Sequence, residues 1–306
     1  TKVRMSAMKI SRRFFVTGAS GLAMTAFMPV GGYALAMAPG QVTHRILAAG
    51  KLSFLTEKAA KAAVLLSMNA EVERDLKELQ EAHDEFDDIL LGFKEGKGSS
   101  GVDRERFYAV NTALKDVANL WAPYRTAVEE IIAARSVDDA HLNMIVGNDE
   151  VLEEACQVVV RRLEQAYGEV DIDASLALAL DFAGRQRMIT QKVCKEIALA
   201  ATGNEAQEHH EKFKKNAAKF GNIVDALIGG GNEYITMAKP PSKAAHNALT
   251  QVQGHWAELQ PTVEALDSVE VPSLDDVVHF CAEMDVLEVE SEKAVLAYEE
   301  AIKAIS

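Results

Sequence analysis

Aromatic residues and prolines are scarce in this sequence. Phe, Trp and Tyr together make up 6% of the 306 residues, and there are only 7 prolines. Sheet proteins are enriched in aromatic and β-branched residues, whereas Ala, Leu, Glu and Lys, which are abundant here, favour helices. The composition therefore argues against a sheet protein and predicts an all-α fold.

Cysteine is also rare, and the 3 cysteines cannot all pair with one another. Cys156, Cys194 and Cys281 stand in apolar stretches, so we expect buried free thiols, although Cys194 and Cys281 fall on helices that could be neighbours. No Cys-x-x-Cys-His motif occurs in the sequence. Covalently attached haem is thereby excluded.

Positive charge is in deficit. The chain has 32 Lys and Arg against 46 Asp and Glu, which gives a net charge of −14. A chain this acidic is repelled by phosphate backbones, so nucleic acid is not an expected partner. Hydrophobic residues make up 48% of the chain and charged residues 25%, a balance that excludes disorder as the main state.

Motifs of catalysis are missing as well: there is no nucleophile elbow, P-loop, dinucleotide-binding loop or metalloprotease signature. Asp138 precedes His141, and Asp276 precedes His279, by three residues. Di-iron bundles need Glu-x-x-His on two helices and two further inward Glu, which we do not find. We interpret both pairs as helix caps with solvent-facing His, and we expect no enzyme activity, no metal and no cofactor.

The first 38 residues resemble a twin-arginine export signal. Arg12 and Arg13 precede a weakly apolar run over 16–33, and small residues at 34–38 offer a cleavage site. We therefore predict a twin-arginine signal peptide over 1–38, a mature chain that begins near Met37 or Pro39, and a periplasmic location. The alternative is a permanent membrane anchor. No later apolar run approaches the length of a membrane span, so we expect the cleaved chain to be soluble.

The rest of the chain contains one unit twice. Residues 49–61 align with 183–195 at an offset of 134, and the match includes an Ala-Gly pair, a Thr and two Lys. An offset of 135 pairs Trp121 with Trp256, the only 2 tryptophans of the protein. An internal duplication of about 130 residues explains both matches.

Each repeat has the pattern of four amphipathic helices with short connections, which predicts an up-and-down four-helix bundle. The expected helices cover about residues 43–68, 70–93, 103–134 and 137–167, and then about 174–201, 205–228, 243–266 and 274–305. We therefore expect two tandem domains, 41–168 and 172–306. The sequence leaves open whether they stack side by side or end to end.

The segment AGRQRMITQK over residues 183–192 resembles the signature that opens the first helix of the PilJ-type domain. This domain is the N-terminal sensor module of type IV pilus methyl-accepting chemotaxis transducers, and it is similar to the periplasmic domains of nitrate/nitrite sensor kinases. The resemblance covers both repeats, but the motif is well formed only in the second. It implies an extracytoplasmic four-helix sensor bundle.

In the nitrate sensors, an arginine of this motif binds a small oxyanion at a two-fold interface between first helices. Carried over by position, that arginine is Arg187; Met188 follows it, and Lys192 stands where those sensors have a second basic residue. In the first repeat Ser53 replaces the arginine and Phe54 the methionine. A symmetric clamp of two arginines therefore cannot form within one chain, which puts nitrate itself in question.

The residues alone also point to an anion site here, because a guanidinium suits bidentate recognition of oxyanions and carboxylates. If the two repeats pack through their first helices, a ligand at Arg187 would face Lys51, Ser53 and Lys58. The candidate ligand-binding residues are Arg185, Arg187, Met188, Lys192, Lys51 and Ser53. The alternative is that these cations pair with acidic helices, such as the one that contains 150–154.

Two functions follow from this reasoning. The first is a soluble periplasmic sensor that binds a small anion, a nitrate-like oxyanion or a carboxylate, and signals to a membrane-bound protein. The second is a structural or adaptor module that docks a receptor or a respiratory complex without a ligand. Expected partners are thus the anion and the membrane protein, with a homodimer as a further option.

Overall fold

The computed structural model describes residues 39–167, 173–233 and 235–305, and we call 41–168 copy one and 172–306 copy two. The predicted signal peptide over 1–38 lies outside the described residues. Copy one contains helices α1 (Pro39–Ser67), α2 (Val72–Glu95), α3 (Tyr108–Ala134), α4 (Asp139–Val146) and α5 (Asp149–Tyr167). Copy two contains α6 (Ala174–Ala201), α7 (Ala206–Gly229), α8 (Lys243–Asp267) and α9 (Leu274–Ile305).

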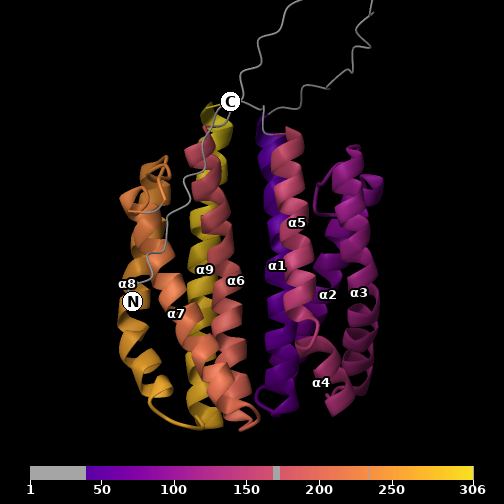
Figure 1. The fold of residues 1–306 in the computed structure, drawn as a ribbon, viewed down its shortest axis with the longest axis vertical. Helices are drawn as coiled ribbons and strands as arrows, with labels where there is room; N and C mark the ends of the chain where they lie inside the picture. The colour runs from indigo at the N-terminus through magenta and orange to yellow at the C-terminus, as the bar shows by residue number, and fades with distance from the viewer. Residues whose placement is uncertain (1–38, 168–172, 234, 306) are drawn as a thin grey trace, which may run out of the picture. The chain divides into compact units, whose positions relative to one another are not determined.

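The prediction of an all-α fold with two tandem helical bundles is confirmed. Apart from an isolated bridge between Gly231 and Thr236, the described part of the chain has no β-structure. Consecutive long helices run alongside one another in each copy (Figure 1). Pro123 and Pro261 lie inside α3 and α8.

The fourth helix of copy one differs from the prediction. We expected a continuous helix over 137–167, but the chain turns at Gly147 and Asn148, which separates α4 from α5. Both residues are poor helix formers, and the amide of Asn148 donates a hydrogen bond of 2.7 Å to the carbonyl of Met144. The helix also begins later than expected, after Asp138, whose carboxylate accepts a 2.8 Å hydrogen bond from the backbone N–H of His141.

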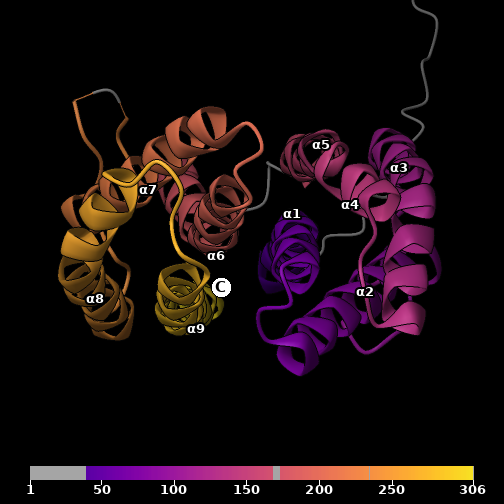
Figure 2. The same ribbon diagram turned by 90° about the horizontal axis from the view of Figure 1, so that it is seen from below.

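The two copies lie side by side along their first helices, which settles the question that the sequence left open. Helix α1 packs against α6, and it also contacts α2 and α5 of its own copy. Helix α6 packs against α7 and α9 in the same way (Figure 2). Since both first helices are covered on several sides, they bury apolar residues around most of their circumference, and one core runs through both copies.

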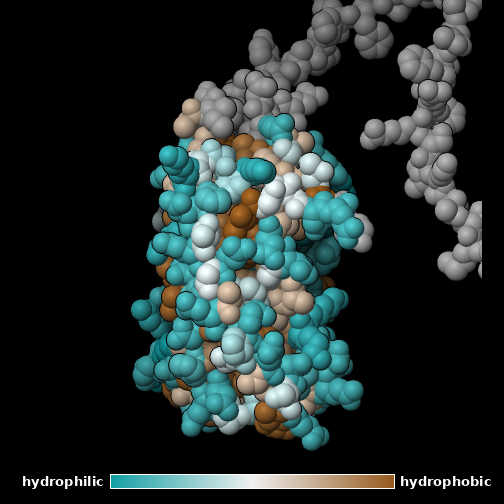
Figure 3. Space-filling model, turned by 90° about the vertical axis from the view of Figure 1, so that its left-hand side faces the viewer, coloured by the Kyte–Doolittle hydropathy of each residue, from teal (hydrophilic) through white to brown (hydrophobic). Residues whose placement is uncertain are grey.

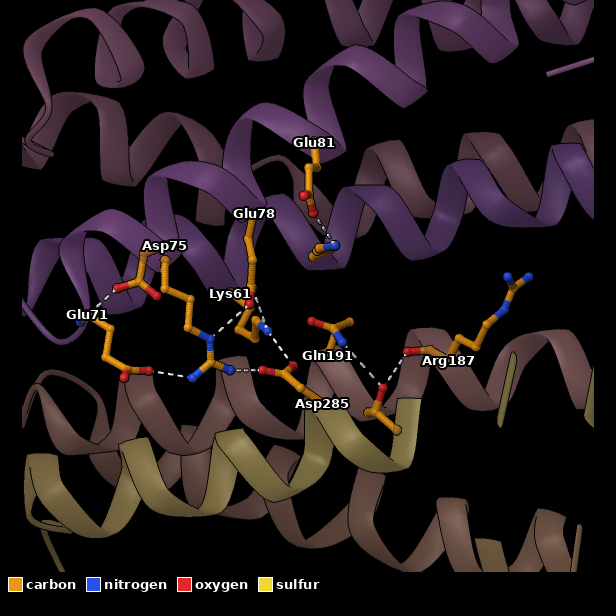
Figure 4. A network of polar contacts seen from close by, with 11 residues as sticks. Lys61, Glu71, Asp75, Glu78, Glu81, Arg187, Gln191 and Asp285 are labelled. Carbon is orange, nitrogen blue, oxygen red and sulfur yellow. Dashed lines mark hydrogen bonds and ion pairs between the residues drawn. The ribbon is translucent and has the colours of Figure 1, made fainter. Parts of the chain in front are cut away.

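Two buried lysines, Lys61 and Lys195, join each first helix to the other copy. Lys61 of α1 forms ion pairs with Asp285 of α9 at 2.7 Å and with Glu78 of α2 at 2.8 Å (Figure 4). Lys195 of α6 forms ion pairs with Asp149, at the start of α5, and with the Glu57 carboxylate of α1 at 2.8 Å. The two lysines occupy equivalent positions, and each is 1% exposed. The first helix of each copy thus carries an equivalent lysine that forms an ion pair with an aspartate of the other copy.

The surface, the cysteines and the hydrophobicity of the helices can also be compared with the predictions from the sequence. The side of copy two on which α8 lies is covered mostly by hydrophilic residues (Figure 3). The three cysteines are free and buried, as predicted. Within the described ranges, none of the helices combines the length and the apolar character that a membrane crossing requires.

The paired lysines lead to a stability prediction. Lys195→Met keeps the length of the side chain but removes the charge that compensates the buried carboxylates of Glu57 and Asp149. Removing one partner of a buried ion pair costs about 3 to 5 kcal/mol, so we expect a loss of this size in the free energy of unfolding, measured in urea. The control is Lys77→Met, which removes the charge of a side chain that is 77% exposed and should change stability by less than about 0.5 kcal/mol. Equal effects of the two variants would contradict the prediction.

Asp75 of α2 gives a second prediction, on pH dependence. Burial raises the pKa of Asp75 from 3.8 to about 6, although a hydrogen bond from the Glu71 backbone N–H partly opposes the shift. Because the folded state holds this proton more tightly than the unfolded chain, the contribution of Asp75 to stability is complete below about pH 4 and is lost as the pH rises through about 6.

Asp75→Asn keeps the side chain neutral at every pH. We therefore expect this variant to exceed the parent in unfolding free energy by about 3 kcal/mol at pH 8, with the difference vanishing near pH 4. Urea unfolding at both pH values measures it, and exposed Asp116→Asn in α3 controls for the change in net charge. A difference that does not depend on pH would overturn this assignment.

Candidate functional site

A small cavity lies between α1 and α6, where the motif of copy two faces copy one. Its volume is about 20 Å³, which is room for a single water molecule. Three of the predicted site residues line it, namely Arg185, Arg187 and Met188. The other lining residues are Ile46, Leu47, Gly50, Gln157, Val160, Leu180, Asp181 and Gly184.

Two equivalent glycines, Gly50 of α1 and Gly184 of α6, contribute to this cavity. A glycine in the middle of a helix often allows a neighbouring helix to approach closely. Here a Cβ atom added to either residue would meet no other atom within 4 Å. The glycines therefore leave space at the interface between the copies instead of permitting a closer contact.

Arg187 points into the contact between the copies and is 3% exposed. Its guanidinium forms an ion pair with Glu292 of α9, and it lies 5.6 Å from the centre of the Phe54 ring on α1. Its Nε–H has no hydrogen-bond partner among the described residues. Burial raises the pKa of Glu288, another acid of α9, and the charge of Arg187 only partly opposes this shift. Arg187 is thus a largely desolvated cation whose buried Nε–H has no hydrogen-bond partner among the described residues.

Ser53 stands at the position of Arg187 in copy one, and it makes the equivalent contact. Its hydroxyl accepts a 3.4 Å hydrogen bond from the amide of Gln157 on α5, and Gln157 occupies the position of Glu292. A neutral Ser–Gln pair in copy one therefore replaces the Arg–Glu ion pair of copy two. Sequence reasoning missed Gln157 and Glu292, although the offset of 135 that aligns the tryptophans also aligns these two residues.

Lys51 and Lys192 lie outside the cavity, and Arg185 lies at its border. Lys51 pairs with Glu85 of α2 at 2.5 Å. Lys192 pairs with Glu57 of α1 at 3.3 Å and with Glu153 of α5. Arg185 borders the cavity but pairs with Asp181 one turn earlier on α6, at 2.8 Å. The structure thus gathers Arg185, Arg187 and Met188, and it places Lys51, Ser53 and Lys192 around them.

A dense group of charges lies further along the same interface. Glu57 of α1 is fully buried between Lys192 and Lys195 of α6. Burial opposes the ionisation of Glu57, but the two ammonium groups outweigh this effect and lower its pKa. Burial likewise opposes the charge on Lys195, yet Glu57 and Asp149 raise its pKa well above the ordinary value. These groups are therefore charged in the folded protein and tie α6 to α1 and α5.

The arrangement suits the recognition of a small anion only if the two first helices move. A cavity for one water molecule is too small for a nitrate or a carboxylate, which have several heavy atoms. A ligand would have to widen the gap between α1 and α6 and compete with Glu292 for the guanidinium of Arg187. Because Gly50 and Gly184 have no side chains, a ligand that entered a widened gap at this point would find free space beside both helices.

The cavity glycines lead to a prediction. Gly184→Ala adds a methyl group that meets no neighbour, and alanine is the better helix former by about 0.8 to 1.0 kcal/mol. We therefore expect the variant to gain about that much in unfolding free energy in urea. Gly254→Ala in α8 is the matched control, because a Cβ atom there also meets nothing within 4 Å, and it should gain as much. A destabilised Gly184→Ala with a stabilised Gly254→Ala would show that the cavity is narrower than described.

The comparisons with known proteins agree with this architecture. A model of one family, described as the type IV pili methyl-accepting chemotaxis transducer N-terminal domain (PilJ), matches residues 41–144 and 173–276. No curated protein and no solved structure matches the chain. The matched segments cover α1 to α3 in copy one and α6 to α8 in copy two, and they include both first helices of the interface. The chain belongs to the PilJ family and carries two tandem copies of its domain.

Proposed function

We propose that this protein is a periplasmic sensor that binds a small anion, a nitrate-like oxyanion or a carboxylate, between α1 and α6, and that it signals to a membrane-bound partner. Membership of a family of chemotaxis transducer domains supports a role in sensing and signalling. The twin-arginine signal expected over 1–38 supports the periplasmic location. Arg187 is the main anion contact in this proposal, and Arg185 and Met188 border the site.

The observation that carries the proposal is the state of Arg187. A guanidinium that is 97% withdrawn from solvent is costly unless its donors are all used, yet its Nε–H is free of partners among the described residues while the cavity lies alongside. An anion in a widened cavity would accept from this donor. A charge-assisted hydrogen bond of this kind contributes about 1.5 to 3 kcal/mol.

A ligand at this position would change contacts of α5 and α9, the last helices of the two copies. Competition with Glu292 would release α9 from Arg187, and separation of α1 from α6 would alter the contact of Gln157 on α5 with Ser53. Small shifts of packed helices are a common form of switching. The signal would therefore leave through α5 and α9, the helices that end each copy.

A second candidate function is an adaptor that docks a protein partner without a ligand. It is favoured by the pairing of every cation of the motif with a carboxylate of the same chain, because such pairs neutralise the charge that would attract an anion. In this alternative Arg187 and Glu292 are structural, and the two copies form a rigid unit. The two candidates differ in what they predict for ligand binding.

Thermal unfolding of the protein from Pro39 onward, with a panel of nitrate, nitrite, sulfate, phosphate, acetate and succinate, separates them. A ligand at a hundred times its dissociation constant adds about 2.7 kcal/mol to stability, so we expect one class of anion to raise the melting temperature clearly. Arg187→Ala should abolish that shift. Gly184→Ala should weaken it, because its methyl group occupies the cavity, whereas Gly254→Ala should leave it unchanged.

The outcomes are distinct. A shift that survives Arg187→Ala would place the anion elsewhere and refute the assignment of this site. No shift with any anion in the panel, together with a normally folded protein, would favour the adaptor.

A further inference from the structure

A second and much larger depression lies in copy one, between α2 and α3. This groove has a volume of about 720 Å³, which falls within the size range of sites for small molecules. Leu90, Leu91 and Phe93 line it from α2, and Leu114, Ala118, Trp121 and Ala122 from α3. Its charged and polar lining residues are Asp87, Lys94, Arg104, Glu105, Asn111, Lys115 and Arg125.

The acids of this groove already have partners. Glu105 is buried against Arg45 of α1, with a hydrogen bond of 2.9 Å. Asp87 accepts a hydrogen bond of 2.7 Å from the indole N–H of Trp121 and pairs with Arg125 at 3.0 Å. Neither carboxylate is therefore available to neutralise the other cations of the groove.

Three cations of the groove form no ion pair within the described part of the chain. Lys94, Arg104 and Lys115 line the groove, are exposed, and form no ion pair with any carboxylate in the described part of the chain. Most other basic side chains of copy one are paired, including Lys51, Lys58 and Lys61 of α1. In a chain with a net charge of −14, three free cations beside an apolar groove are an unusual concentration of positive potential.

The described residues of copy two that are equivalent to the groove residues differ from them. At the position of Asp87 copy two has Gly221, and Trp256 lies so close to this glycine that an added Cβ atom would be 2.7 Å from its indole nitrogen. At the positions of Leu91 and Ala118 it has Asp225 and Gln253, which bridge α7 and α8 by a hydrogen bond of 2.7 Å. In copy two, Trp256 and the bridge thus stand at positions whose counterparts line the groove of copy one.

Two of the three free cations are also confined to copy one, whereas Arg104 has a basic counterpart in Lys239. At the positions of Lys94, Lys115 and Arg125, copy two has Ile228, Thr250 and Gln260. The two copies therefore differ in three respects at the same place: the bridge between the helices, the packing of the tryptophan, and the charge of the rim. All three differences make copy one the more suitable host for an anion with an apolar body.

We propose that the groove between α2 and α3 binds a small amphipathic carboxylate. The apolar part of the ligand lies along Leu90, Leu91 and Leu114, and its carboxylate is held by Lys94, Arg104 and Lys115. Apolar lining with a few polar groups that fix the orientation is the usual construction of such sites. This site is separate from the cavity at Arg187, so the protein would have one ligand site between the two copies and a second within copy one, for two different kinds of anion.

Octanoate is a suitable probe, and Trp121 is a local reporter of its binding. In a Trp256→Phe background, Trp121 is the single tryptophan. We expect octanoate to change its fluorescence in a saturable manner. Octanamide, which lacks the charge, should bind about tenfold more weakly, and acetate, which lacks the apolar chain, should have no effect on Trp121. Calorimetry on the unmodified protein provides an independent measurement of the octanoate affinity.

Two variants install the residues of copy two in the groove. Leu91→Asp with Ala118→Gln should form the bridge and abolish octanoate binding. Lys94→Ile with Lys115→Thr should weaken binding by about tenfold or more. The matched control is Lys77→Ile with Lys214→Thr, which makes the same change in net charge at exposed lysines away from the groove and should leave binding unchanged. All variants are first compared with the parent in thermal unfolding.

Several results would overturn the proposal. If octanoate neither changes Trp121 fluorescence nor gives a calorimetric signal, the groove does not take such a ligand. Equal affinity for octanamide would refute recognition of the carboxylate. Undiminished binding to the correctly folded bridge variant, or its loss in Arg187→Ala, would place the ligand outside the groove.

Discussion

The exchange of buried ion pairs between the two first helices is the contact on which the rest of the structure depends. Lys61 of copy one reaches Asp285 of copy two, and Lys195 of copy two reaches Asp149 of copy one. Each lysine is buried and would be strongly destabilising without its partners. Because both sets of partners are complete only when α1 lies beside α6, these pairs specify the arrangement of the two bundles as well as their association.

Around this contact the two copies have diverged in opposite ways. Copy two has Arg187, and it holds this side chain against Glu292 beside a small cavity. Copy one has the neutral Ser53 and Gln157 at the same place, and it has a groove between α2 and α3 where copy two has the hydrogen bond between Asp225 and Gln253. Duplication allows such division, since each copy can supply the core that the other needs while its own surface changes.

With the two sites that we propose, this division would give the protein two kinds of input within one chain. The interface cavity would respond to a compact anion, and the groove to an anion with an apolar body. Both sites adjoin helices that pack on α1: α6 borders the cavity, and α2 forms one wall of the groove. A ligand at either site would therefore bias the position of α1, which is the element that the two bundles share.

Most of the secondary structure, the duplication and the family resemblance could be derived from the sequence, because helical periodicity and repeated motifs are local and can be counted along the chain. The break between α4 and α5 could not. The sequence also placed Arg187 and Met188 beside each other on a first helix, and the cavity includes both. It could not determine which carboxylate each cation meets, since Glu292 and Glu153 are distant in the chain and reach Arg187 and Lys192 only through packing. Nor could it reveal the groove, because Leu91 and Ala118 are ordinary helix residues until α3 lies opposite α2. Tertiary structure decided the side-by-side arrangement for the same reason: buried charges acquire their energies from neighbours that only the folded chain brings together.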